Sequence, residues 1–173
     1  NDGVLPLGKD VKKVAVIGPN ADNDYNQLGD YTSPQALERV VTMLKGIKQM
    51  PDIEVLYEKG CAIRDEADAD IEAAVRVAKA ADVVVLVVGG SSARDFRLSF
   101  FSDQKEARSA DLIPARDCGE GYDRSTLDLL GRQNELLNAV YAVGKPVVTV
   151  YVEGRPMLKN LAAEKSNALL TMW

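Results

Sequence analysis

The run Val83–Val88 constrains the fold of this chain more than any other segment. All six residues are apolar, and five of them are the β-branched residue valine. A strand with one face in water alternates apolar and polar side chains, whereas a strand that is buried on both faces is apolar throughout. The run therefore predicts a central strand of a parallel sheet that is covered on both sides.

Strand-like and helix-like segments alternate along the rest of the chain. Further strands are predicted at Lys13–Gly18, Ile53–Tyr57, Pro146–Val152 and Asn167–Trp173. Helices are predicted at Thr32–Ile47, Asp70–Ala81, Ser125–Val143 and Met157–Ala163, with hydroxyl caps at Thr32 and Ser125. This order predicts an α/β fold of three layers, in which a mostly parallel sheet carries helices on both faces, as in flavodoxin-like folds. No helix follows the fifth strand to cover it, so we expect the fold to be truncated there.

The composition narrows the possible chemistry. The 173 residues suit a single domain, and the net charge of −5 argues against a nucleic-acid partner, which would require a basic face. No apolar run approaches the ~20 residues that cross a membrane, so no membrane partner is expected. The chain has no histidine, which excludes serine–histidine catalysis and imidazole metal sites. No metal or cofactor is expected.

The two cysteines, Cys61 and Cys118, are too few for a cysteine-rich zinc site. A disulfide between them is one interpretation, because the sequence does not give their separation. Two separate buried thiols are the preferred interpretation.

Residues 91–124 form a connection far longer than the ~2–6 residues that are common in this class of fold. A loop of this length is typical of a functional segment. It holds all three phenylalanines, Phe96, Phe100 and Phe101, among many charged side chains. Aromatic faces beside hydrogen-bonding groups suit sugar binding. The alternative is that the phenylalanines anchor the loop to the body of the domain.

Glu120 is the carboxylate of this loop that we single out, because it lies between Gly119 and Gly121. Flanking glycines let the backbone bend sharply and let a ligand approach closely. A carboxyl in a partly desolvated pocket has a raised pKa and serves as a general acid near neutral pH. The alternative is a solvated loop glutamate. Asp123 and Arg124 are expected to form a local ion pair or to brace the start of the next helix.

Several motifs together resemble the second domain of family 3 glycoside hydrolases, in particular its bacterial β-glucosidase-like members. The most specific is Cys118–Arg124, followed by Ser125–Leu129. The others, in chain order, are Asn1–Leu7, Val14–Asp22, Gly29–Tyr31, Tyr57–Cys61, Ala73–Val85, Ser91–Phe96, Gln133, Lys145–Val148 and Gly154–Pro156. The resemblance covers nearly the whole chain in order.

The resemblance implies part of a two-domain, retaining β-glycosidase that hydrolyses terminal non-reducing sugars from an oligosaccharide or glycoside. An upstream barrel domain of the same polypeptide would hold the nucleophilic aspartate and most of the sugar pocket. Residues 1–12 would be the linker that leads into the present domain, and the barrel and a C-terminal remainder would lie outside this chain. We therefore expect these 173 residues alone to be inactive. The resemblance also implies a periplasmic or secreted enzyme.

The motif maps the acid/base carboxyl of the family onto Glu120. The fallback candidates for this role are Asp95, Asp117 and Asp123. The residues expected to bind substrate are Arg94, Asp95, Phe96, Tyr122, Asp123 and Arg124.

Two other functions remain open at this level. The first is a flavodoxin-like or response-regulator-like binding domain, because Gly18–Asp22 follows the first predicted strand, where phosphate loops occur. That segment lacks the repeated glycines and the lysine of phosphate-binding motifs. The second is a structural module that only supports a partner domain.

Overall fold

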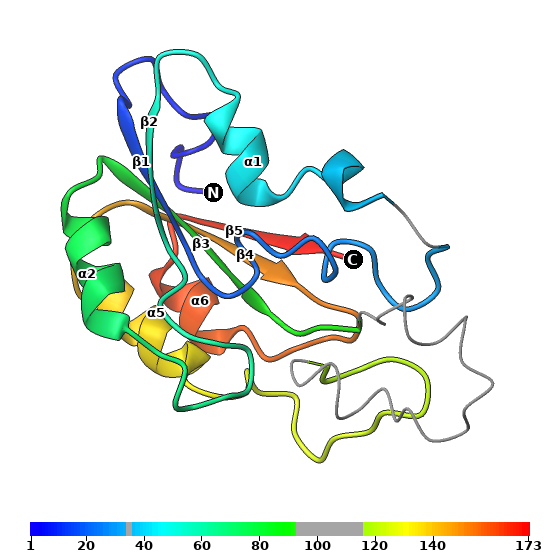
Figure 1. Cartoon of the computed structure of the whole chain (residues 1–173). Helices are drawn as coiled ribbons and strands as arrows, with labels where there is room; N and C mark the ends of the chain where they lie inside the picture. The colour runs from blue at the N-terminus through cyan, green and yellow to red at the C-terminus, as the bar shows by residue number, and fades with distance from the viewer. Residues whose placement is uncertain (34–35, 93–115) are drawn as a thin grey trace.

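The computed structural model describes residues 1–33, 36–92 and 116–173, and five strands within them form one sheet (Figure 1). The strands are β1 (Lys13–Ile17), β2 (Glu54–Glu58), β3 (Val83–Gly89), β4 (Val147–Val152) and β5 (Ala168–Met172). Their order is β2-β1-β3-β4-β5, and each neighbouring pair is parallel. This is the doubly wound order of flavodoxin-like folds. The predicted fold class is confirmed.

Helices cover both faces of this sheet. The described helices are the 3-10 turn η1 (Leu37–Arg39), α1 (Met43–Lys48), α2 (Ile71–Lys79), α5 (Gln133–Tyr141) and α6 (Asn160–Lys165). Figure 1 shows α2, α5 and α6 on one side of the sheet and α1 on the other. The side of α1 is also covered by the N-terminal segment, from which Val4, Leu5, Leu7 and Val11 pack against the core.

The central strand β3 is buried on both faces, as its composition predicts. Val84, Leu86 and Val88 belong to the core beneath α2, α5 and α6. Val83, Val85 and Val87 belong to the core on the side of α1. Since successive side chains of a strand point to opposite faces, a fully apolar strand is the one that two helical layers require.

The predicted start of the first helix, at Thr32, is wrong. Residues 34–35 lie outside the described part, but η1 and α1 are two short separate pieces, and the N-cap of α1 is Thr42, whose hydroxyl accepts from the Lys45 amide at 3.2 Å. The reason is tertiary. The Thr42 hydroxyl also donates to Asp22 at 2.6 Å, and the Leu44 amide donates to the Ala21 carbonyl at 2.9 Å. These bonds to the loop after β1 fix where the helix begins.

The helix predicted from Ser125 also begins later, at Gln133. Asp128, three residues after Ser125, is instead part of a local turn, in which its carboxylate accepts from the Thr126 hydroxyl at 2.8 Å. The Leu127 carbonyl accepts from the Leu158 amide at 3.0 Å, a bond to the segment after β4. Backbone groups that bond to another segment are not free for helix formation, so residues 125–132 remain a loop.

The helix predicted at 157–163 lies slightly further along the chain, at Asn160–Lys165. The Met157 amide and the Lys159 ammonium both donate to the buried Glu153 carboxylate, at 3.1 Å and 2.6 Å. These bonds hold residues 157–159 in a connecting turn.

Both cysteines are free and buried, which confirms the interpretation as two separate thiols. Burial raises the pKa of the Cys61 thiol from 9.0 to about 12. Burial, with the charge of Asp117 as a second cause, raises the pKa of the Cys118 thiol to about 11. Both groups are therefore neutral thiols at physiological pH.

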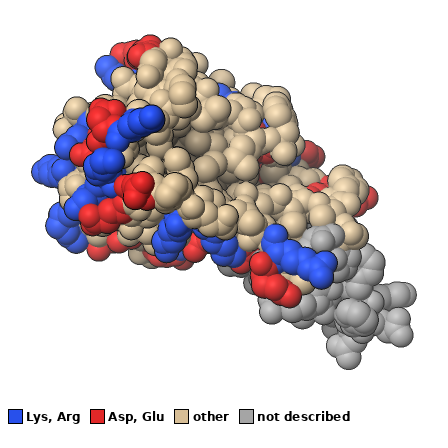
Figure 2. Space-filling view, turned by 90° about the horizontal axis from the view of Figure 1, so that it is seen from above, with Lys and Arg blue, Asp and Glu red and all other residues tan. Residues whose placement is uncertain are grey.

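The surface carries both signs of charge. In the face that Figure 2 shows, acidic and basic side chains intermingle along one margin, and much of the rest is uncharged. Among the residues that the structure describes, no helix is long and apolar enough to cross a membrane.

Candidate functional site

The candidate site lies at the carboxyl edge of the sheet, where the loops after β1 and β3 diverge. In doubly wound folds this switch point is where ligands bind. The long loop leaves β3 at Ser91, and its described end returns to the same residue. The Asp117 and Cys118 amides donate to the Ser91 carbonyl at 2.8 Å and 3.3 Å, and the Ser91 amide donates to the Asp117 carboxylate at 2.6 Å. The described end of the loop is thereby fixed to the end of β3.

Glu120 lies at the tip of a tight turn that follows this anchor. Gly119 and Gly121 have φ values of +109° and +70°, which explains why glycine occupies both positions. The Glu120 side chain is exposed, but its backbone is held on both sides. Its amide donates to the Asp30 carboxylate at 2.6 Å, and its carbonyl accepts from the Arg116 guanidinium at 3.0 Å.

Asp30 and Arg116 form a buried ion pair beneath the turn. The Arg116 Nη2 atom lies 3.3 Å from Asp30 Oδ1, and both side chains are 5% exposed. Arg116 Nε also donates to the Cys118 carbonyl at 3.2 Å. The turn packs closely on the pair, because a Cβ atom on Gly119 would lie 2.7 Å from Asp30 Oδ2. The group that comes close to Gly119 is therefore the ion pair of its own domain, whereas the sequence suggests a ligand.

Tyr122 is held among three arginines. Arg64 donates to its hydroxyl at 3.1 Å, and Arg155 donates to its carbonyl at 2.8 Å. The Arg116 guanidinium lies 5.4 Å from the centre of its ring. Arg64 follows β2 and Arg155 follows β4, so the turn is bound to the loops of several strands. Tyr122 thereby fastens the turn; a contact with substrate stays a prediction.

Arg124 pairs with Asp117, rather than with Asp123. The two groups are 2.6 Å apart, and their side chains are 7% and 1% exposed. Arg124 also donates to the Asp128 carbonyl. The predicted ion pair between Arg124 and Asp123 is therefore wrong. Arg124 does brace the segment that follows it, although that segment is a loop and not the start of a helix. Because Asp117 is buried and bonded through both oxygens, Glu120 and Asp123 are the exposed carboxyls in the described part of the loop.

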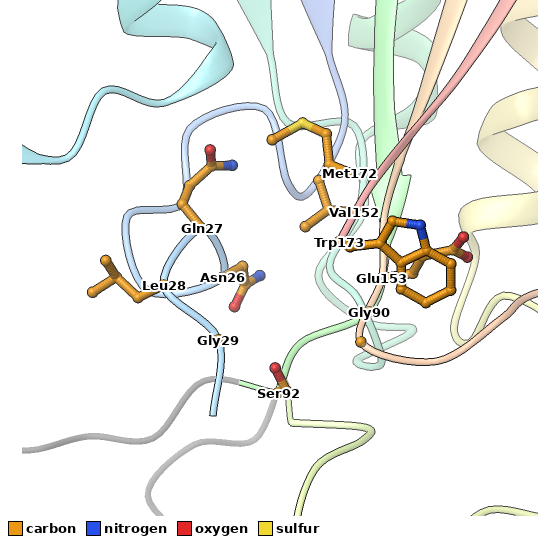
Figure 3. Close-up of a pocket in the computed structure, with 11 residues that line it drawn as sticks. Asn26, Gln27, Leu28, Gly29, Gly90, Ser92, Val152, Glu153, Met172 and Trp173 are labelled. Atoms are coloured by element: carbon orange, nitrogen blue, oxygen red, sulfur yellow. The ribbon is translucent and has the colours of Figure 1, made fainter. Parts of the chain in front are cut away.

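Beside the turn, a cavity of about 110 Å³ opens between the ends of β3, β4 and β5 (Figure 3). Its lining includes Asn26, Gln27, Ser92, Glu153, Met172 and Trp173. This volume is well below the ~300–1,000 Å³ of typical ligand pockets. The cavity has room for a few water molecules and is too small to enclose a sugar.

The phosphate-loop alternative at Gly18–Asp22 has a different explanation in the structure. A Cβ atom on Gly18 would lie 2.1 Å from the Val87 carbonyl oxygen, so glycine is required by the close approach of β3. The Asn20 side chain donates to the Gly90 carbonyl at 3.0 Å. These residues join two loops of the domain to each other. No group of three or more potential metal ligands occurs within residues 1–33, 36–92 and 116–173.

Comparison with known proteins places the chain in a family. The family model described as the glycosyl hydrolase family 3 C-terminal domain matches residues 1–173. The chain belongs to this family. The resemblance noted from its motifs is confirmed.

The relatives of this family 3 C-terminal domain include enzymes for two sugars. A β-xylosidase of Formosa agariphila is 34% identical over 182 residues, which cover 100% of this chain and 22% of that protein. A periplasmic β-glucosidase of Salmonella typhimurium is 28% identical, with 98% of this chain and 22% of that protein covered. The chain spans about a fifth of the length of such relatives.

Solved structures agree in fold. A β-glucosidase from intestinal bacteria that is involved in saponin metabolism has a TM-score of 0.69 and 31% identity, over 91% of this chain and 23% of that one. A β-glucosidase of Listeria innocua in complex with isofagomine has a TM-score of 0.70 and 26% identity, over 98% of this chain and 20% of that one.

The residues predicted for the site fall into two groups in this family 3 domain, and a third set was not predicted. Arg94, Asp95 and Phe96 lie outside the described residues. Glu120, Tyr122, Asp123 and Arg124 lie together at the carboxyl edge of the sheet. Asp30, Arg64, Arg116 and Arg155, which hold the turn, received no role from the sequence. Asp30 and Arg155 lie in motifs of the resemblance, but no sequence signal marks Arg64.

Proposed function

We propose that this domain supplies the acid/base carboxyl of a two-domain, retaining β-glycosidase. Glu120 is that carboxyl, and a companion barrel domain upstream in the same polypeptide holds the nucleophile and most of the sugar pocket. The substrate is a glycoside with a terminal non-reducing β-glucosyl or β-xylosyl unit, in keeping with the two kinds of relative. A periplasmic or secreted location is proposed with it, since one relative is a periplasmic β-glucosidase.

One observation carries this proposal. The Glu120 side chain is exposed at the edge of the sheet while its backbone amide and carbonyl are both bound to a buried ion pair. An acid that must reach into a pocket built by another domain has to project from its own domain and still be held in place.

The chemistry follows from two carboxyls on either side of the glycosidic bond. In retaining enzymes they lie ~5–5.5 Å apart. The nucleophile of the companion domain attacks the anomeric carbon, and Glu120 gives its proton to the departing oxygen. Glu120 then takes a proton from water, which attacks the same carbon and releases the sugar.

Glu120→Gln in the full-length enzyme tests the proposal. The amide cannot give up a proton, so kcat/KM for a phenyl glycoside should fall by ~10²–10⁴. The fall should be small for a 2,4-dinitrophenyl glycoside, whose leaving group needs no protonation. Glu72→Gln, the same change on the exposed face of α2, is the matched control and should retain activity.

If Glu120→Gln hydrolyses the phenyl glycoside at the unchanged rate, the proposal is contradicted, and the domain is a structural module or uses another acid. Asp123→Asn, measured in the same way, shows whether the neighbouring exposed carboxyl has the role instead.

A further inference from the structure

We infer that Asp30 is a positioning residue for proton transfer: through its buried pair with Arg116 it holds the Glu120 carboxyl in register with the leaving group. This inference rests on the proposed function of Glu120. Asp30 lies in the loop after β1, 90 residues before Glu120, and has no role in the chemistry proposed above.

The geometry gives Asp30 direct control of the turn. Its Oδ2 atom accepts from the Glu120 amide at 2.6 Å, while Arg116 donates to the Glu120 carbonyl at 3.0 Å. Both polar backbone groups of Glu120 are therefore bound by the two members of one ion pair. Hydrogen bonds to ionised groups are shorter and stronger than those between neutral groups, so the peptide planes on either side of the Glu120 Cα atom are held firmly.

Burial makes the pair a rigid support. Asp30 and Arg116 are each 5% exposed in their side chains, and Gly119 packs against both. Removal of one member leaves the other charge buried without its partner, which is strongly unfavourable. Without Asp30, Arg116 keeps only the neutral carbonyls of Cys118 and Glu120 as acceptors, so we expect the turn to shift until the guanidinium is better solvated.

A small movement of an acid has a large effect on the reaction that it catalyses. A misplacement of ~1 Å costs on the order of 100-fold in rate. The Glu120 side chain projects from its turn, so a rotation of the backbone is carried to the carboxyl. The effect should therefore fall on the proton-transfer step and spare steps that need no proton.

The test is a double-mutant cycle in the full-length enzyme with Asp30→Asn, Glu120→Gln and both together. Asp30→Asn should lower kcat/KM for the phenyl glycoside by on the order of 100-fold and change the value for the 2,4-dinitrophenyl glycoside little. Added azide, a nucleophile that needs no general base, should raise turnover of the dinitrophenyl substrate by Asp30→Asn as it does for Glu120→Gln. Because Asp30 acts through Glu120, adding Asp30→Asn to Glu120→Gln should cause no further loss.

Glu153→Gln is the matched control. Glu153 is a buried carboxylate at the same edge of the sheet, with a fully buried side chain and an ion pair to Lys159 at 2.6 Å, and its bonds run to residues 157 and 159. Its replacement should lower stability without changing the ratio of the two substrates. Arg116→Lys, which keeps the charge but not the fork of donors, provides a second variant should Asp30→Asn fold poorly, and should show the same dependence on leaving group.

Equal losses for both substrates, or additive losses in the double variant, would overturn the inference, since Asp30 would then support the fold alone. That outcome is distinct from failure of the proposed function, in which Glu120→Gln itself shows no dependence on the leaving group.

Discussion

At the scale of single residues, the two glycines around Glu120 are required for different reasons. Both have positive φ, but a Cβ atom on Gly119 would meet Asp30 and Arg116 at 2.7 Å and 2.8 Å, whereas one on Gly121 would meet nothing within 4 Å. Gly119 is therefore required by packing as well as by conformation.

The change Gly121→Ala should cost about 1–2 kcal/mol, the strain of alanine in the left-handed region. Gly119→Ala should cost a further ~1–3 kcal/mol, because it also crowds the buried pair. Urea unfolding of the two variants measures the difference in the free energy of unfolding. Equal losses would mean that the ion pair adjusts to the extra methyl group.

The buried thiols give a prediction about alkaline pH. Burial raises the pKa of Cys61 from 9.0 to about 12 and that of Cys118 to about 11. In the unfolded chain both thiols ionise at lower pH, so their contribution to stability is complete below about pH 9 and is lost as the pH rises through these raised values. The free energy of unfolding should fall between pH 9 and 11 by up to ~1.4 kcal/mol per pH unit for each thiol. The slope should shrink in Cys61→Ala, and an unchanged slope would assign it to other groups.

At the scale of elements, strand composition and helix starts carry different kinds of information. The position of β3 follows from its own six apolar residues, since no other arrangement buries both of its faces. The start of α1 depends instead on bonds from Thr42 and Leu44 to residues after β1. Hydroxyl residues that look like caps occur at several places, and tertiary bonds select among them.

Thr42→Ala should therefore cost about 0.5–2 kcal/mol, because the N-cap of α1 is lost. Ser125→Ala, at the position where the sequence alone predicts a cap, should stay within ~0.5 kcal/mol, because that residue is exposed and precedes a loop. Thermal unfolding of both variants compares the two predictions. A larger loss of stability in Ser125→Ala than in Thr42→Ala would support the longer helix that the sequence predicts from Ser125.

At the scale of the whole molecule, the doubly wound order brings the ends of the strands to one edge. The turn of Glu120 is bound there by residues that follow β1, β2, β3 and β4, through Asp30, Arg64, Ser91 and Arg155. The cavity that residues 26–29, 90, 92, 152–154 and 172–173 line at this edge is about 110 Å³, which is too small for a sugar. The proposed companion domain would supply most of the sugar pocket.

The 173-residue chain alone should hydrolyse neither phenyl nor 2,4-dinitrophenyl glycosides, because the proposed nucleophile lies in the companion domain. The full-length enzyme is the positive control in the same assay. Turnover by the purified chain, lost in Glu120→Gln, would show that both carboxyls lie within it.

The sequence by itself determined the fold class, the five strands and the place of Glu120 between two glycines. These features are local. The composition of a strand indicates whether both of its faces are buried, and the glycines of a turn indicate where the chain bends. It did not determine the starts of α1 and α5, the partner of Arg124, or the support beneath Glu120. The tertiary structure decided these, because an ion pair between Asp30 and Arg116 joins residues 86 positions apart, and no local pattern of charge specifies which distant partner a side chain meets.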